Sequence, residues 1–110
     1  MGDEQVLELL AVYDGLERAL HAAADQHAGL RSGVALVQRQ LALFLEREGL
    51  QLLPGGEAQL FDPRHQEAVA QVESETLPPA TVATVLRRGF LRRGRLFRPT
   101  QVVVVFRPDP

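Results

Sequence analysis

The first half of the chain carries apolar residues at helical spacing. From Asp3 to about residue 24, and again from about residue 30 to Glu48, they recur at intervals of three and four. This pattern predicts two helices separated by a break at 25–29. The apolar stripe of the second helix is typical of the seam of a packed helix pair, and it comprises Leu30, Val34, Val37, Leu41 and Phe44.

Further apolar residues of the second helix, Leu36, Leu43 and Leu45, lie outside that stripe. A helix that is apolar on more than one side needs more than one neighbour, because a two-helix hairpin alone would leave that surface in water. We therefore expect the hairpin to dimerise into a four-helix bundle. The expected dimer interface comprises Leu9, Tyr13, Leu16, Leu20, Val34, Val37, Leu41 and Phe44.

The pattern changes after Gly49, which is placed to end the second helix in the left-handed conformation. The rest of the chain is rich in Val, Thr, Phe and Leu, with Pro and Gly between the apolar runs, and it predicts a small all-β domain. A tight hairpin turn is expected at Arg93 and Gly94, and both faces of the valine run at 102–106 are expected to be covered. The predicted strands are 71–73, 81–88, 90–92, 95–98 and 101–107.

The predicted fold class is therefore α+β, with a two-helix hairpin at residues 1–49 and a β domain at 50–110. A length of 110 residues suits one small domain or two sub-domains. The chain has no Cys, which excludes disulfides, thiolate metal sites and cysteine nucleophiles. No apolar run approaches the roughly 20 residues of a membrane span, and the acidic start has no signal-peptide character, so we expect a soluble cytoplasmic protein without a membrane partner.

The net charge of −2 conceals an asymmetry along the chain. Residues 1–50 hold 4 Arg against 8 acids, residues 51–86 hold 1 against 5, and residues 87–110 hold 7 against 1. All twelve basic residues are Arg, whose planar fork suits bidentate recognition of carboxylates and phosphates. The absence of Lys excludes Schiff-base chemistry and lysine nucleophiles.

Residues that could carry catalysis are few. The histidines are His21, His27 and His65, and none is three or four residues from another, the spacing of metal ligands on a helix. Ser32 and Ser74 lie outside any nucleophile elbow. Gly55 and Gly56 form no phosphate loop, and the acids Glu67, Glu73 and Glu75 are expected to be a solvated rim. We expect no enzyme, no catalytic residue, no metal, no cofactor and no small-molecule substrate.

The segment 87–98 interleaves six Arg with Phe90, Leu96 and Phe97. Basic residues with aromatic side chains are typical of a nucleic-acid surface. Alternation in a hairpin would instead turn the rings into the sheet and the Arg side chains to solvent. A third interpretation is docking on an acidic protein partner, and the overall acidic balance favours a protein over nucleic acid.

Four motifs, in order and at matching spacing, resemble the C-terminal half of the GrpE family, the nucleotide exchange factors of DnaK-type chaperones. They are LLAVYDGLERAL at 9–20, FLEREGL at 44–50, FDPRHQEAV at 61–69 and GFLRRGRLFRPTQVVV at 89–104. Departures from the family pattern are Ala11, Gly15, Gln66, Phe97 and Thr100.

The resemblance implies a homodimer in which residues 1–49 form the bundle and residues 50–110 a β-wing. In the family the wing inserts beside the nucleotide cleft of the chaperone's ATPase domain and speeds ADP release. The chain lacks the family's long N-terminal helix, so roles of that helix in thermosensing or substrate mimicry are not expected of it. It is either an excised piece or a naturally short relative.

Carried over by position, the resemblance implies chaperone contacts at Arg95, Phe61, Pro63, Leu86 and Val104. Arg95 is the leading candidate, because a charged fork at a hairpin tip can pair with a carboxylate of the chaperone. Arg98, Gly89 and Phe90 are expected to brace the wing. The alternative is a small Arg-rich nucleic-acid-binding β domain on a dimeric helical scaffold, which would bind with a steep salt dependence.

Overall fold

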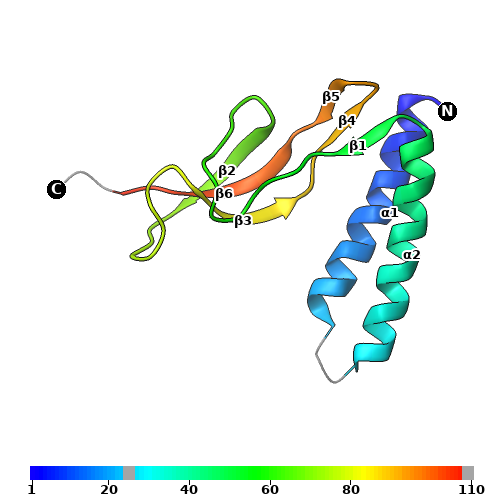
Figure 1. Ribbon diagram of the computed structural model, residues 1–110, viewed down its shortest axis with the longest axis horizontal. Coiled ribbons are helices and arrows are strands. Elements are labelled where there is room, and N and C mark those ends of the chain that lie inside the picture. The colour runs from blue at the N-terminus through cyan, green and yellow to red at the C-terminus, as the bar shows by residue number, and fades with distance from the viewer. Residues whose placement is uncertain (24–26, 108–110) are drawn as a thin grey trace. The chain divides into compact units, whose positions relative to one another are not determined.

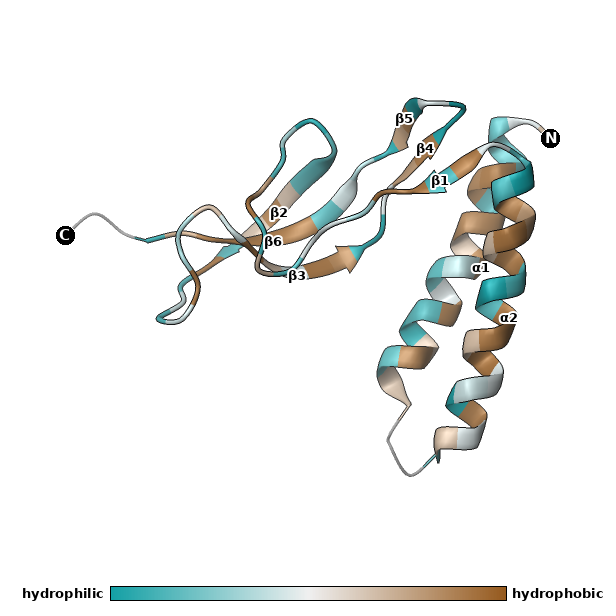
Figure 2. Cartoon of the chain, in the orientation of Figure 1, coloured by the Kyte–Doolittle hydropathy of each residue, from teal (hydrophilic) through white to brown (hydrophobic). Residues whose placement is uncertain are grey.

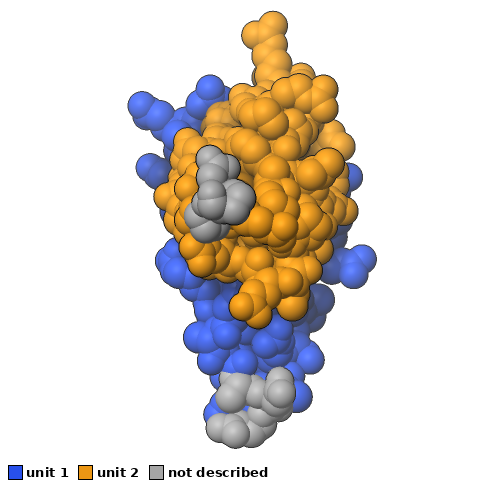
Figure 3. All heavy atoms as spheres, turned by 90° about the vertical axis from the view of Figure 1, so that its left-hand side faces the viewer, with its two compact units in different colours: residues 1–49 blue, residues 50–110 orange. Residues whose placement is uncertain are grey.

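The computed structural model of the chain describes residues 1–23 and 27–107 (Figure 1). The chain divides into two compact units, Met1–Gly49 and Leu50–Pro110, coloured separately in Figure 3. The first contains α1 (Asp3–Ala22) and α2 (Ala28–Arg47). The second contains β1 (Leu50–Leu52), β2 (Gln66–Val72), β3 (Val82–Arg87), β4 (Phe90–Arg92), β5 (Arg95–Arg98) and β6 (Thr100–Val105). This is the predicted α+β layout.

The ends of the two helices agree with the prediction except at the start of α2. Gly49 has φ +86° and follows the last turn of α2 in the left-handed conformation, as expected. Residues 24–26 of the predicted break lie outside the described residues, but α2 already includes Gly29, so the break was predicted too long. A glycine in an exposed first turn costs only part of its helix penalty, which explains the difference. Within the described residues, neither helix has the length and apolar character that crossing a membrane requires.

Two hydrogen bonds identify the sides on which α1 and α2 face each other. Gln38 Nε2 donates to Glu17 Oε2 at 2.7 Å, and Arg31 Nη1 donates to the Leu20 carbonyl oxygen at 2.9 Å. Residues on the Gln38 side of α2 include Val34, Leu41 and Leu45, and Leu45 is only 1% exposed.

The predicted seam of α2 is therefore buried only in part within a single hairpin. Leu45, which was placed outside it, is buried, whereas Leu30, Val37 and Phe44 are exposed. Spacings of three and four also describe the neighbouring stripe, one residue away, so spacing alone cannot distinguish the two.

The second unit consists of two three-stranded sheets, in the orders β1-β4-β5 and β2-β6-β3. The first sheet is antiparallel, while in the second β6 pairs in parallel with β2 and antiparallel with β3. Strand β1 was not predicted, because its pairing partner β4 lies about forty residues further along the chain. Strand β2 begins at Gln66 rather than at residue 71, since its first residues have weak strand propensity and only the pairing with β6 makes them a strand.

The core of the second sheet is a cluster of Val82, Val102 and Val104, against which Phe61 and Val85 pack. Along β6 the exposure alternates, with Val102 buried and Val103 half-buried. The prediction that both faces of the valine run are covered agrees with the burial of Val102, Val104 and Val105 and the partial burial of Val103, and the last residue of the run, Phe106, is 37% exposed. The side chains remain apolar on the thinner face because β6 is the central strand, with a neighbour on each edge.

Gly89 lies where the two sheets meet, and no other residue fits there. A Cβ on Gly89 would come 2.6 Å from the Arg98 carbonyl oxygen, an atom of the backbone that cannot move aside. The Gly89 N–H donates to Thr100 Oγ1 at 2.9 Å, and Thr100 is 1% exposed. The departure at Thr100 therefore has a structural role, since its hydroxyl satisfies a buried backbone donor.

Candidate functional site

The β4–β5 hairpin presents Arg95 to solvent. Its turn residues, Arg93 at φ +50° and Gly94 at φ +80°, are both left-handed, as a two-residue hairpin turn requires, and the predicted turn is confirmed. Arg95 pairs with Arg92 across the turn, and its side chain is exposed, as is that of Leu96. The guanidinium group at this hairpin end is therefore accessible to a partner.

The interpretation in which alternation turns the Arg side chains of this segment to solvent does not hold for Arg92 and Arg98, which are 9% and 7% exposed. Arg98 Nε donates to the Arg88 carbonyl oxygen at 2.8 Å, and its guanidinium carbon lies 5.3 Å from the centre of the Phe90 ring. A register shift between Phe90 and Leu91 interrupts the alternation in this hairpin. Arg98 thus braces the hairpin, as predicted.

Arg88 continues this brace into the loop after β1. Its Nη1 donates to the Gly55 carbonyl oxygen at 2.6 Å. Of the six Arg residues in 87–98, only Arg87, Arg93 and Arg95 are classed as exposed. Only about half of the Arg side chains in this segment are therefore available to contact a nucleic acid.

The FDP motif divides into an inward and an outward residue. Phe61 is half-buried against the valine cluster, and its N–H donates to the Ala80 carbonyl oxygen at 2.9 Å. Pro63 is exposed in the turn that leads into β2. Pro63 can therefore reach a partner directly, whereas Phe61 mainly supports the turn from below.

Asp62 closes this turn through both carboxylate oxygens. Oδ1 accepts hydrogen bonds from the backbone N–H of Arg64 at 3.0 Å and from its Nε at 3.2 Å, and Oδ2 lies 3.1 Å from His65 Nδ1. These interactions, with the Arg64 backbone bond the strongest, lower the pKa of Asp62. Gln66 Oε1 accepts the Asp62 N–H at 2.8 Å, so this departure also supports the turn.

The two remaining residues expected to contact a chaperone differ in exposure. Leu86 is 55% exposed on β3, whereas Val104 is 8% exposed and belongs to the valine cluster. We therefore correct the expectation for Val104, because a buried side chain packs the sheet and cannot offer a contact surface. Leu86 and Arg95 lie on different sheets, and the Arg98–Arg88 hydrogen bond connects the two strands' ends.

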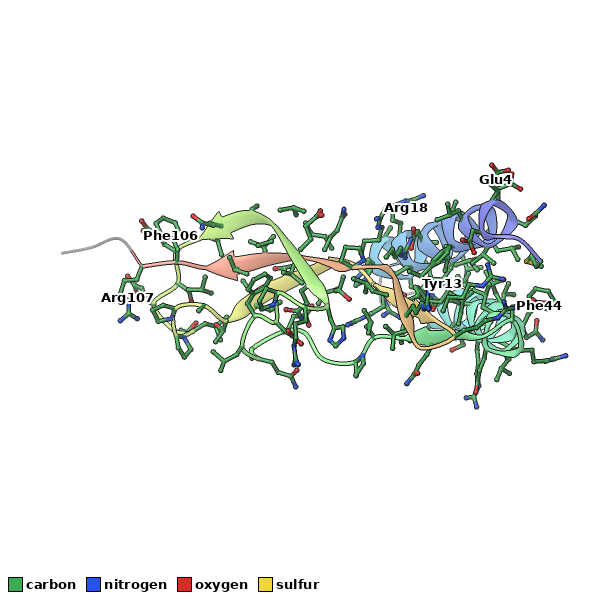
Figure 4. All side chains as sticks on the ribbon, turned by 90° about the horizontal axis from the view of Figure 1, so that it is seen from above. Glu4, Tyr13, Arg18, Phe44, Phe106 and Arg107 are labelled. Atoms are coloured by element: carbon green, nitrogen blue, oxygen red, sulfur yellow. The ribbon has the colours of Figure 1, made fainter. Side chains whose placement is uncertain are left out.

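The residues expected at a dimer interface also separate into two groups. Tyr13 is 8% exposed and Leu20, Val34 and Leu41 are half-buried, whereas Val37 and Phe44 are 51% and 39% exposed. In Figure 4, Phe44 projects from the flank of α2, away from Tyr13. Leu9 and Leu16 are half-buried as well, so Val37 and Phe44 are the two of the eight expected interface residues that are exposed in a single chain.

An apolar face remains on one flank of the hairpin. On α1, Leu9 and Leu16 come one residue before Leu10 and Glu17, which face α2. On α2, Val37 and Phe44 come one residue before Gln38 and Leu45, which face α1. One residue turns a helix by about 100°, and in two antiparallel helices this rotation brings both stripes to the same flank. Val12, 54% exposed between Leu9 and Leu16, belongs to this face and was missed, although its i+3 spacing from Leu9 could have identified it.

A hollow lies at the end of the hairpin where α1 ends and α2 begins. It has a volume of about 500 Å³ and is lined mainly by Leu20, Leu30, Val34 and several alanines. Figure 2 shows the hydrophobic colouring of both helices. Among residues 1–23 and 27–107, no three His, Cys, Asp or Glu side chains gather where they could hold a metal ion.

The sequence of the chain is similar to that of known proteins. The GrpE family model matches residues 2–105. The chain is 44% identical over 98 residues to Protein GrpE of Stenotrophomonas maltophilia strain R551-3, covering 88% of the chain and 56% of the relative. It is 41% identical over 98 residues to that of Xylella fastidiosa strain 9a5c, with the same coverage, and 31% identical over 109 residues to that of Methanosarcina barkeri strain Fusaro, covering 97% and 52%. The chain thus spans slightly more than half the length of these relatives.

Proposed function

The chain belongs to the GrpE family, and from this premise we propose that it is the bundle-and-wing part of a nucleotide exchange factor. It binds the ATPase domain of a DnaK-type chaperone and promotes ADP release. The observation that carries the proposal is the braced hairpin, which holds the exposed Arg95 fork at its end. A hairpin that is held in place presents the planar Arg95 fork at a fixed backbone position, where it can pair with a carboxylate.

The proposed mechanism is a shift between two conformations of the chaperone. The wing binds the ATPase domain in its open form more tightly than in its closed, nucleotide-bound form. By thermodynamic linkage, the factor then weakens ADP affinity as much as ADP weakens the binding of the factor. This mechanism requires contact only, and it assigns no bond-making step to the chain.

We assign three exposed residues to the contact with the chaperone. Arg95 pairs with a carboxylate, while Leu86 and Pro63 add apolar area. Phe61 supports the turn that presents Pro63. The Arg98–Arg88 hydrogen bond keeps the hairpin of Arg95 in a fixed relation to the end of the strand that carries Leu86.

We further propose that the hairpin dimerises through its apolar face. On α1 the face has the three-four spacing of helix-packing surfaces, at Leu9, Val12 and Leu16. Val12, Val37 and Phe44 are exposed in a single chain, and Leu9 and Leu16 are half-buried. A second hairpin applied to this flank would complete a four-helix bundle.

A mixing experiment tests the proposed function. The chain is combined with a nucleotide-free DnaK-type ATPase domain on a sizing column, with and without added ADP. The proposal predicts a stable complex that dissociates when ADP is added. A complex that forms equally well with saturating ADP, or no complex between folded partners, would contradict it.

A further inference from the structure

Strand β2 is an open edge of its sheet. Among the described strands it pairs only with β6, and it is the longest strand of the chain, with seven residues. Every residue after Gln66 is exposed, including Val69 at 45% and Val72 at 41%. An exposed edge with apolar side chains is the surface to which extended peptides add as a further strand.

The opposite edge of the same sheet is protected. The Ala58 N–H donates to the Val82 carbonyl oxygen at 2.8 Å, and the Val82 N–H donates to the Gln59 carbonyl oxygen at 2.8 Å. Further along β3, Glu57 Oε1 accepts the Val85 N–H at 3.3 Å. The loop before residue 61 thus covers β3. No described segment covers the outer edge of β2, which carries one register irregularity between Ala68 and Ala70 and one charged residue, Glu67.

A pocket lies past the ends of β2 and β6. It has a volume of about 320 Å³ and is lined by Glu73, Ser74, Glu75, Phe106 and Arg107. The Phe106 N–H donates to the Val72 carbonyl oxygen at 3.0 Å, which fixes the aromatic residue beside the end of the strand. In Figure 4, Phe106 and Arg107 project to opposite sides of the chain.

The charge along this edge is acidic. Glu67 lies near the start of β2, Glu73 and Glu75 follow its end, and Arg107 is the one cation among the residues that line the pocket. Two carboxylates beside an aromatic ring suit a cationic side chain, which gains an ion pair and a cation–π contact together. The edge and the pocket therefore favour the same kind of ligand, an extended segment with an apolar middle and a basic end.

We propose that the β2 edge binds an extended, basic-ended polypeptide segment by strand addition, with one cationic side chain of that segment in the Glu73–Phe106 pocket. Backbone hydrogen bonds along β2 hold the segment, Val69 and Val72 contact its apolar side chains, and Glu73 and Glu75 select its charge. The site does not use Arg95 or the apolar face of the hairpin, so it is independent of the proposed nucleotide exchange.

Four labelled peptides test this site by fluorescence anisotropy with the full chain. The first alternates valine and threonine over seven residues, the length of β2, and ends in two arginines. Two further peptides have the same sequence with N-methyl groups on alternate residues, one peptide for each of the two alternating sets, so that each lacks the backbone donors of one edge. The fourth replaces the arginines with glutamates.

The expected result is saturable binding of the first peptide, with roughly tenfold weaker binding of the glutamate peptide and of one of the two N-methylated peptides. Equal binding of both N-methylated peptides would overturn strand addition. Equal binding of the glutamate peptide would overturn the assigned pocket. Absence of binding at millimolar peptide would overturn the proposal as a whole, as would a molar mass above that of the hairpin dimer that Val69→Lys lowers, which would indicate that β2 edges of two copies pair with each other.

Matched variants locate the site on the molecule. Val69→Lys places a charge on the open edge, and Leu60→Lys makes the same change at a residue that is 73% exposed and outside β2. The proposal predicts that the first variant weakens peptide binding roughly tenfold and the second leaves it unchanged. Equal effects of the two variants would overturn the assignment to β2. Glu73→Gln is expected to reduce the preference for the arginine peptide over the glutamate peptide, and an unchanged preference would contradict the role of Glu73.

Discussion

Arg98 reaches back across the wing to the carbonyl oxygen of Arg88, with 2.8 Å between Nε and oxygen, while its guanidinium lies over the Phe90 ring. This hydrogen bond connects the end of β3, in one sheet, to the β4–β5 hairpin, in the other sheet. Arg98 belongs to the Arg-rich segment that suggests a binding surface in the sequence, but in the structure it supports the hairpin that presents Arg95.

Replacement of Arg98 by Ala is expected to lower the free energy of unfolding by about 1.5–3 kcal/mol, since a buried carbonyl group loses a charged donor. Urea unfolding of the two proteins measures the difference. Arg87→Ala, at an exposed residue of β3, is the control and should change the free energy by no more than about 0.5 kcal/mol. Equal effects of the two substitutions would show that Arg98 is no brace.

Gly89→Ala is expected to destabilise the wing by more than about 2 kcal/mol, because its Cβ would meet backbone atoms of residues 98–100 at 2.6 Å or closer. The control is Gly15→Ala within α1, where a new Cβ meets only Arg18 Nη2 at 3.6 Å. That change should stabilise the helix by about 0.5–1 kcal/mol. Thermal unfolding of both variants checks the pair, and a neutral Gly89→Ala would contradict the close approach.

Phe44→Glu is expected to convert the proposed dimer into a monomer, because a carboxylate would be buried in the apolar face of the hairpin. Sedimentation equilibrium reports the molar mass. Leu36→Glu makes a similar change at a residue that is 58% exposed on another side of α2, and it should leave the dimer intact. If the dimer persists in Phe44→Glu but dissociates in Leu36→Glu, the interface lies on the Leu36 side of α2, and the proposed interface is wrong.

The turn around Asp62 is expected to weaken in acid. The folded state lowers the pKa of Asp62 below its ordinary value of 3.8, so its contribution to stability is present above that value and is lost as the pH falls through the lowered pKa. Unfolding of the native chain should therefore show a steeper loss of stability below about pH 4 than unfolding of Asp62→Asn. Parallel pH profiles for the two proteins would contradict the role of the Asp62 carboxylate.

The sequence was informative where one local signal determines the structure. Apolar spacing located both helices, and the Arg93–Gly94 pair located the hairpin, because two left-handed residues are needed there. It was less informative where a distant neighbour decides. Strand β2 depends on its pairing with β6, and the burial of Arg98 depends on Arg88 and Phe90.

The candidate contact residues show the same division. Exposure of Arg95 follows from its place beside a tight turn, which the sequence specifies. Burial of Val104 follows from the central position of β6, and the burial of Leu45 in place of Phe44 follows from the side on which α2 meets α1. Neither relationship is encoded in a short stretch of residues.

The most direct test of the proposed function is the release of fluorescent ADP from a DnaK-type ATPase domain, followed by stopped flow. We predict that the full chain accelerates release, that Arg95→Ala reduces the acceleration at limiting concentrations by roughly tenfold, and that Arg93→Gln, at the adjacent exposed Arg, has little effect. No acceleration by the folded chain, or equal acceleration by the wild-type chain and Arg95→Ala, would contradict the account.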